Sequence, residues 1–141
     1  MKIIRWILFL PTAFAGALVA RFLWDLSNTL LVKFHLGVFT QWLFWGVGEV
    51  IGILALLYIA IKIVPSKKKI IGYILSSLGV IFGLLTTGYV GYLLFTVGIH
   101  SGDPEFIRDL VQGTVTGIIE GVTSAFIFIG LKQGHLKHWI I

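Results

Sequence analysis

The chain contains no cysteine, three prolines and few charged residues, and these shortages exclude several classes of protein. Without cysteine it can form no disulfide, thiol redox centre or cysteine-ligated metal site. Charged residues make up 12% of the 141 positions and hydrophobic residues 57%. A soluble domain is about a quarter charged and less than half apolar. A soluble core of this size cannot bury so many apolar side chains, so we expect lipid to surround them.

Four long apolar stretches account for most of the chain. A helix needs about 20 predominantly apolar residues to cross the hydrocarbon core of a bilayer. The sequence therefore predicts an all-α integral membrane bundle of four transmembrane helices, in one domain that covers residues 1–141. The predicted spans are residues 3–23, 42–64, 70–97 and 104–131.

The connection between the first two spans is long enough to hold a structure of its own. Arg21 and Asp25 close the first span, and their four-residue spacing predicts an ion pair on one helix face. In the following stretch, residues 26–41, Ser27 and Asn28 can cap a helix, and apolar residues then alternate with polar ones. This pattern predicts a short amphipathic helix that lies in the interface plane.

The start of the fourth span carries the strongest local signal in the chain. Asp103 can cap a helix, Pro104 suits the first helical position, and Glu105 places an acid in the first turn. We therefore expect a helix to begin at Pro104, outside the bilayer, and to run into it.

The basic residues predict how the protein lies in the membrane. If the four spans alternate in direction, eight of the eleven lysines and arginines fall on the side of the two termini. Basic residues collect on the cytoplasmic side of membrane proteins, so we expect both termini in the cytoplasm and the protein in the plasma (inner) membrane. The basic run after the second span is also expected to contact lipid headgroups. This run consists of Lys67, Lys68 and Lys69.

Small residues recur every four positions along several spans. Such ladders let helix backbones approach closely within a membrane. They predict either contacts with other chains, in a homo-oligomer or a larger complex, or internal packing of the four helices. The glycines concerned are Gly113, Gly117 and Gly121, then Gly79, Gly83 and Gly91, and finally Gly48 and Gly52.

Two acids lie within the predicted spans. Glu120 shares a helix face with Thr116 and Ser124, each four residues away, because steps of three, four and seven residues return to nearly the same angle. An ionised group at the bilayer centre costs about 2.5–3.5 kcal/mol or more, and such groups usually mark functional sites. Glu49 is the second acid, and Arg21 is its nearest candidate partner.

Three interpretations of Glu120 and Glu49 remain open from the sequence. They can form proton or cation sites in a transport path. They can pair with polar groups of a partner subunit across an interface. They can also be protonated and hydrogen-bonded within the bundle, with a structural role alone.

Little in the chain predicts an enzyme. The histidines form no zinc-site pattern, and neither a phosphate-binding loop nor a nucleophile–base pair is recognisable. We therefore expect no metal, cofactor or nucleic-acid partner. The leading hypothesis is a non-enzymatic subunit of a membrane complex that packs through its glycine-rich faces. The alternative is a small oligomeric transporter or channel, coupled to protons or ions through Glu120 and Glu49.

Overall fold

The computed structural model describes residues 2–32 and 38–141, and within them the chain is helical with short connections. Four of its helices are long and apolar enough to cross a membrane. This confirms the predicted all-α four-helix fold of an integral membrane protein. The long helices are α1 (Lys2–Val32), α2 (Val38–Ile63), α3 (Lys68–Leu93) and α5 (Pro104–Gln133). The short elements are the π-helical turn η1 (Leu94–Gly98), α4 (Ile99–Ser101) and α6 (Lys137–Ile140).

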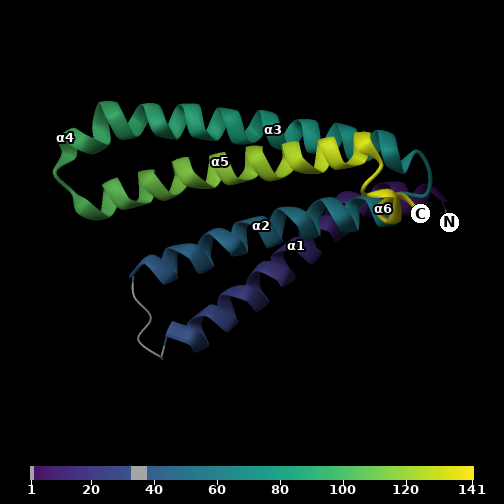
Figure 1. The fold of residues 1–141 in the computed structure, drawn as a ribbon, viewed down its shortest axis with the longest axis horizontal. Helices are drawn as coiled ribbons and strands as arrows, with labels where there is room; N and C mark the ends of the chain where they lie inside the picture. Colours follow the sequence, from purple (N-terminus) through teal and green to yellow (C-terminus); the bar gives the residue numbers. More distant parts are fainter. Residues whose placement is uncertain (1, 33–37) are drawn as a thin grey trace.

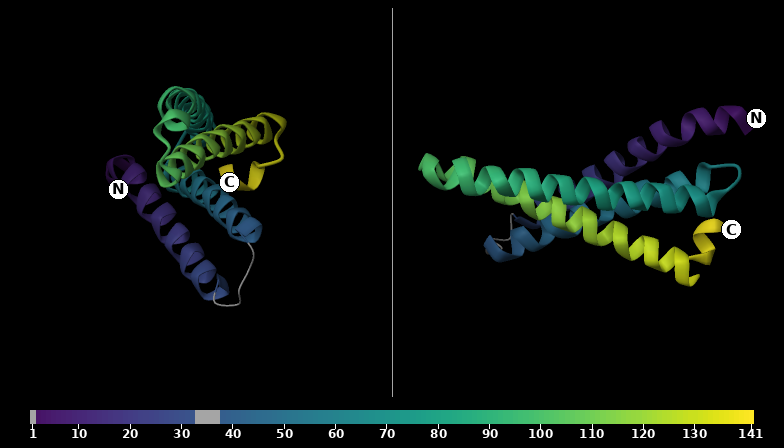
Figure 2. Two further views of the ribbon diagram at one scale, coloured as in Figure 1. Left: turned by 90° about the vertical axis from the view of Figure 1, so that its left-hand side faces the viewer. Right: turned by 90° about the horizontal axis from the view of Figure 1, so that it is seen from above.

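The four long helices form two antiparallel hairpins (Figure 1). One hairpin pairs α1 with α2, and the other pairs α3 with α5. The hairpins meet mainly where α2 lies against α5 and α3, and they diverge toward the end that carries α4 (Figures 1 and 2). Both chain termini and the α2–α3 connection lie at the opposite end. The basic residues that the sequence assigned to one side therefore gather at one end of the molecule.

The first helix is longer than the sequence predicted. Residues 26–32, assigned above to a separate interfacial helix, continue α1 without a break, and residues 38–41 belong to α2. The remainder of that predicted helix, residues 33–37, lies outside the described residues. The hydroxyls of Ser27 and Thr29 donate to the carbonyls of Leu23 and Asp25, each at 2.9 Å. Since these side chains bond to the preceding turn and no glycine or proline occurs between 17 and 36, nothing ends the helix at residue 23.

The third helical segment is also longer than predicted. It continues past residue 97 through η1 and α4, and it ends at Gly102, whose positive φ of 67° suits a glycine. Asp103 then caps α5 as predicted, because its carboxylate accepts hydrogen bonds from the backbone N–H groups of Glu105 and Phe106. Pro104 is the first residue of α5, which confirms the predicted helix start.

The buried core lies in the half of the bundle nearest the termini. There α2 packs against α5 through a cluster of four buried side chains. Residues of α6, including Trp139, cover this cluster. The core thus joins the two hairpins at one end, and toward the other end they separate. The four buried side chains of this cluster are Leu57, Ile61, Ile127 and Leu131.

Candidate functional site

The glycine faces of α3 and α5 lie against each other. A Cβ atom added to Gly83 would lie 2.6 Å from both the carbonyl oxygen of Gly117 and the Cα of Gly121. One added to Gly117 would lie 2.7 Å from the backbone nitrogen of Thr87. Backbone atoms cannot move aside as side-chain ends can, so these positions accept glycine alone. For α3 and α5 this geometry favours internal packing over contact with another chain.

The remaining predicted glycines divide into packed and open positions. Gly79 lies against the Ser124 side chain, and Gly113 lies against Val90. Gly91 makes ordinary contact with Thr114. In contrast, a Cβ at Gly52 would have no neighbouring atom within 4 Å.

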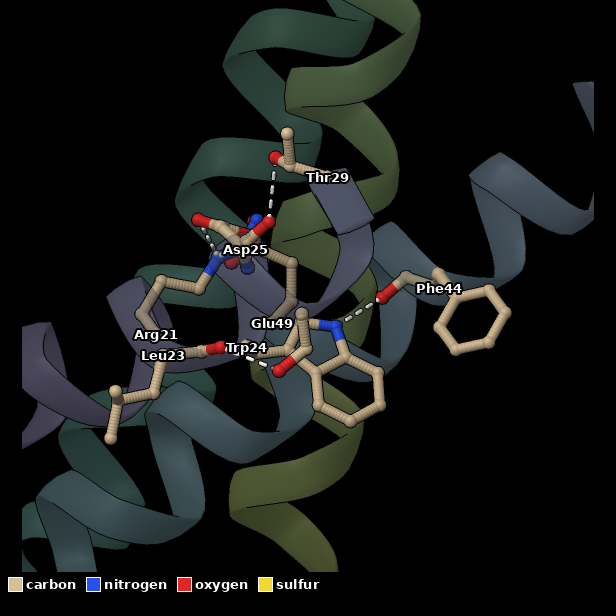
Figure 3. A network of polar contacts seen from close by, with 8 residues as sticks. Arg21, Leu23, Trp24, Asp25, Thr29, Phe44 and Glu49 are labelled. Atoms are coloured by element: carbon tan, nitrogen blue, oxygen red, sulfur yellow. Dashed lines mark hydrogen bonds and ion pairs between the residues drawn. The ribbon is translucent and has the colours of Figure 1, made fainter. Parts of the chain in front are cut away.

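Gly48 makes room on α2 for two side chains of α1. A Cβ there would lie 2.6 Å from Cδ1 of Trp24 and 3.2 Å from the guanidinium carbon of Arg21. With this space free, the Trp24 indole N–H donates to the backbone carbonyl of Phe44 at 2.7 Å (Figure 3). Gly48 therefore serves the α1–α2 contact.

Arg21 forms ion pairs with two carboxylates. Its Nη1 lies 2.8 Å from Oε1 of Glu49, and its Nε lies 3.0 Å from Oδ2 of Asp25 (Figure 3). The Arg21 and Glu49 side chains are each 23% exposed. Both partners that the sequence suggested for Arg21 are thus found. However, the extension of α1 to Val32 places Arg21 inside the helix, so it does not mark the end of a span.

Glu120 lies near the ion pairs of Arg21 but forms no ion pair or hydrogen bond of its own among the described residues. It is half-buried, and it lies close enough to Glu49 for the two carboxylates to interact electrostatically. Among the described residues, none forms a hydrogen bond or ion pair with Glu120. The cluster of Arg21, Asp25, Glu49 and Glu120 therefore has one cationic group and three acidic groups.

Glu120 lines a pocket of about 520 Å³ to which all four long helices contribute. Ser124, which is 1% exposed, lies beside it on α5, and Thr86 adds a second hydroxyl from α3. The other lining residues are Gly79 and apolar side chains, which include Phe14 of α1 and Phe82 of α3. An acid and two hydroxyls in an apolar pocket can hold a ligand that carries one polar or charged group.

The pocket contains only part of the predicted site. Glu120 and Ser124 are brought together, whereas Thr116 and Glu49 are not among its lining residues. Thr86 was not among the site residues predicted from the sequence. Its place in the same pocket as Glu120 depends on how α3 is aligned with α5, and no local pattern in the sequence indicates this alignment.

The predicted headgroup lysines lie at the end that carries the termini. The Lys68 ammonium donates to the carbonyl of Ile141 at 3.2 Å, so this lysine holds the last residues against the α2–α3 connection. Lys67 and Lys69 are exposed.

A comparison with protein families, curated proteins and solved structures finds no match. The site itself therefore carries the functional inference.

Proposed function

We propose that this integral membrane protein is a small transporter, not an enzyme, and that Glu120 is the site at which it couples to protons or cations. The observation that carries this proposal is the unpartnered Glu120 carboxylate, which lines a pocket between four apolar helices. Acids inside membrane proteins are costly, and they mark substrate paths and proton relays.

The charge balance of the cluster supports a site that exchanges its occupant. Arg21 is shared by Glu49 and Asp25, so the cluster carries one positive and three negative charges when all its acids are ionised. A proton on Glu120 or a bound cation reduces this excess of negative charge. Because a proton and a bound cation each occupy the Glu120 carboxylate, the two compete for it. Such competition is the basis of coupled exchange.

The orientation in this proposal follows from the positive end of the molecule. With both termini in the cytoplasm, Lys67 and Lys69 meet the headgroups of the inner leaflet. Leu10 and Phe14, which line the pocket, belong to the half of α1 that begins at that end. The pocket then lies toward the cytoplasmic side of the bilayer.

Reconstitution into liposomes tests this function. The purified protein should dissipate an imposed pH gradient, measured with a pH-sensitive dye inside the vesicles. Glu120→Gln should abolish this flux, because an amide cannot release a proton in the working range. Glu105→Gln is the matched control, since Glu105 lies on the same helix at its exposed start. Wild-type flux equal to that of empty liposomes would refute the proposal.

The second candidate function is that of a subunit in a homo-oligomer or larger membrane complex. It is favoured by two open glycines, since a Cβ added to Gly52 or Gly88 would have no neighbour within 4 Å. In addition, α1 packs mainly on α2 and leaves most of its surface uncovered. Partner helices could approach the backbone closely at such positions.

Native mass measurement of the gently extracted protein tests the subunit hypothesis. A stoichiometric partner chain or a homo-oligomer is expected, and Gly88→Leu or Gly52→Leu should release it. Gly117→Leu is unsuitable for this test, because the new side chain would collide with Thr87 and Gly83 of the same chain. A monomer without partners would contradict the subunit hypothesis.

A further inference from the structure

We infer that the Glu120 pocket binds an organic cation with an apolar body, such as a quaternary ammonium or phosphonium ion. This inference rests on the proposed function of Glu120 as a cation site, and it names the class of substrate. It does not require that the bound cation be transported.

The charges around the pocket select a cation over an anion. Glu120 and Glu49 interact through space, and Glu49 shares Arg21 with Asp25. The guanidinium thus already faces two carboxylates. An anion in the pocket would meet the unpaired Glu120, whereas a cation would be paired with it. In a site walled by apolar groups this difference is large, because the low dielectric strengthens both attraction and repulsion.

The few oxygen ligands in the pocket do not suit a calcium or magnesium ion. Calcium takes six to eight oxygen ligands, and magnesium requires near-octahedral coordination. The lining side chains offer the carboxylate of Glu120 and the hydroxyls of Ser124 and Thr86. Among the described residues, no three His, Asp or Glu side chains come together in a metal-binding group. An organic cation needs no such ligand set, since its charge is spread over an apolar body.

The apolar residues that line the rest of the pocket suit the apolar body of an organic cation. The pocket volume of about 520 Å³ lies within the range of about 300–1,000 Å³ that small-molecule sites occupy. Phe14 and Phe82 line it from α1 and α3, and aromatic faces attract organic cations. Both rings are more than half exposed, at 56% and 62%, so they also face the lipid. The ligand can therefore enter from the bilayer, between α1 and α3.

Tetraphenylphosphonium and tetraphenylborate form a suitable probe pair, because they share a shape and carry opposite charges. The experiment measures their binding to the full chain in nanodiscs of zwitterionic lipid. Tetraphenylphosphonium should bind saturably, at least tenfold more weakly to Glu120→Gln, and more weakly as the pH falls and protons compete. Glu120→Asp should retain much of the affinity. Tetraphenylborate should show no binding that depends on Glu120. Equal phosphonium binding to wild type and Glu120→Gln would overturn the inference.

A second pair of variants keeps the test informative if Glu120→Gln fails to fold. Phe14→Ala should weaken phosphonium binding several-fold, because it removes one aromatic wall. Phe22→Ala, on the same helix and also exposed, lies outside the pocket lining and should have no effect. Equal affinities in these two variants would likewise overturn the inference.

The binding and flux measurements separate this inference from the proposed function. Phosphonium binding that depends on Glu120, without proton flux, would support the cation site and refute transport. Proton flux that depends on Glu120, without phosphonium binding, would support transport and refute an organic cation as the substrate.

Discussion

At the scale of single residues, Arg21 determines which acids within the bundle are paired with a positive charge. It pairs with Glu49 of the neighbouring helix and with Asp25 of its own helix. Among the described residues, none pairs in this way with Glu120. One guanidinium thus stabilises two acids and leaves the third available for a proton or ligand.

Replacement of Arg21 should destabilise the protein strongly. Arg21→Met leaves Glu49 without its partner in a largely apolar environment, and because the pair is partly buried the cost should approach the roughly 3 kcal/mol that removal of one member of a fully buried pair causes. The free energy of unfolding, measured by denaturant titration in detergent, should fall accordingly.

A double variant and a surface variant serve as controls for Arg21. Arg21→Met combined with Glu49→Gln should be less destabilised than the sum of the single changes, because the two residues interact directly. Arg108→Met should have little effect, since that guanidinium is 60% exposed and lies 4.0 Å from its nearest acid. An additive double variant would contradict the Arg21–Glu49 pair.

Gly48 and Gly52 should respond oppositely to alanine. Gly48→Ala would displace Trp24 and weaken its hydrogen bond to Phe44, so stability should fall by about 1–3 kcal/mol. Gly52→Ala meets no neighbour and should raise stability by up to about 1 kcal/mol, because alanine favours the helix. Unfolding midpoints of the two purified variants test this, and similar shifts would contradict the geometry at Gly48.

At the scale of elements, the close contact between α3 and α5 sets the alignment of the second hairpin. Gly83 lies between Gly117 and Gly121, and this contact places Thr86 and Gly79 near Glu120 and Ser124. The pocket therefore depends on a helix contact that contains no charged group.

Because the chain has no cysteine, an introduced pair can test this alignment directly. The Cβ of Val90 lies 3.8 Å from the Cβ position at Gly113, which matches the mean Cβ separation in disulfides. Val90→Cys combined with Gly113→Cys should form a disulfide within one chain on mild oxidation, seen as a mobility shift without dimers.

Gly88→Cys with Gly113→Cys is the matched control and should remain reduced, because Gly88 has no neighbour within 4 Å. Gly83→Leu in the cross-linking background should lower the disulfide yield, since its side chain would force α3 away from α5. Disulfides that form only between chains would show that these helices meet a partner instead.

At the scale of the whole molecule, the basic end should face the cytoplasm. Ser66→Cys, in the α2–α3 connection, and Ser101→Cys, before α5, lie at opposite ends and are both exposed. An impermeant maleimide added outside intact cells should label Ser101→Cys alone, and Ser66→Cys should require inverted vesicles. The reverse pattern would refute the proposed orientation.

Features encoded within a few residues were predictable. The cap at Asp103, the helix start at Pro104 and the Arg21–Asp25 pair all depend on spacings of at most four positions. The length of α1 was not predicted, because Ser27 and Asn28 are compatible with either a cap or a helix interior. The structure places the Ser27 hydroxyl on the Leu23 carbonyl, within a continuous helix.

The sequence alone determined that this is an all-α membrane protein with four spans, because the count and length of apolar runs follow from the need to match a bilayer. It also determined that Glu120 and Glu49 are unusual, because acids are costly in such runs. Only the tertiary structure decided that Arg21 partners Glu49 and leaves Glu120 unpaired, and that Thr86 joins the pocket. These relations depend on the alignment of helices distant in sequence, which close contacts at glycines set and which no local pattern encodes.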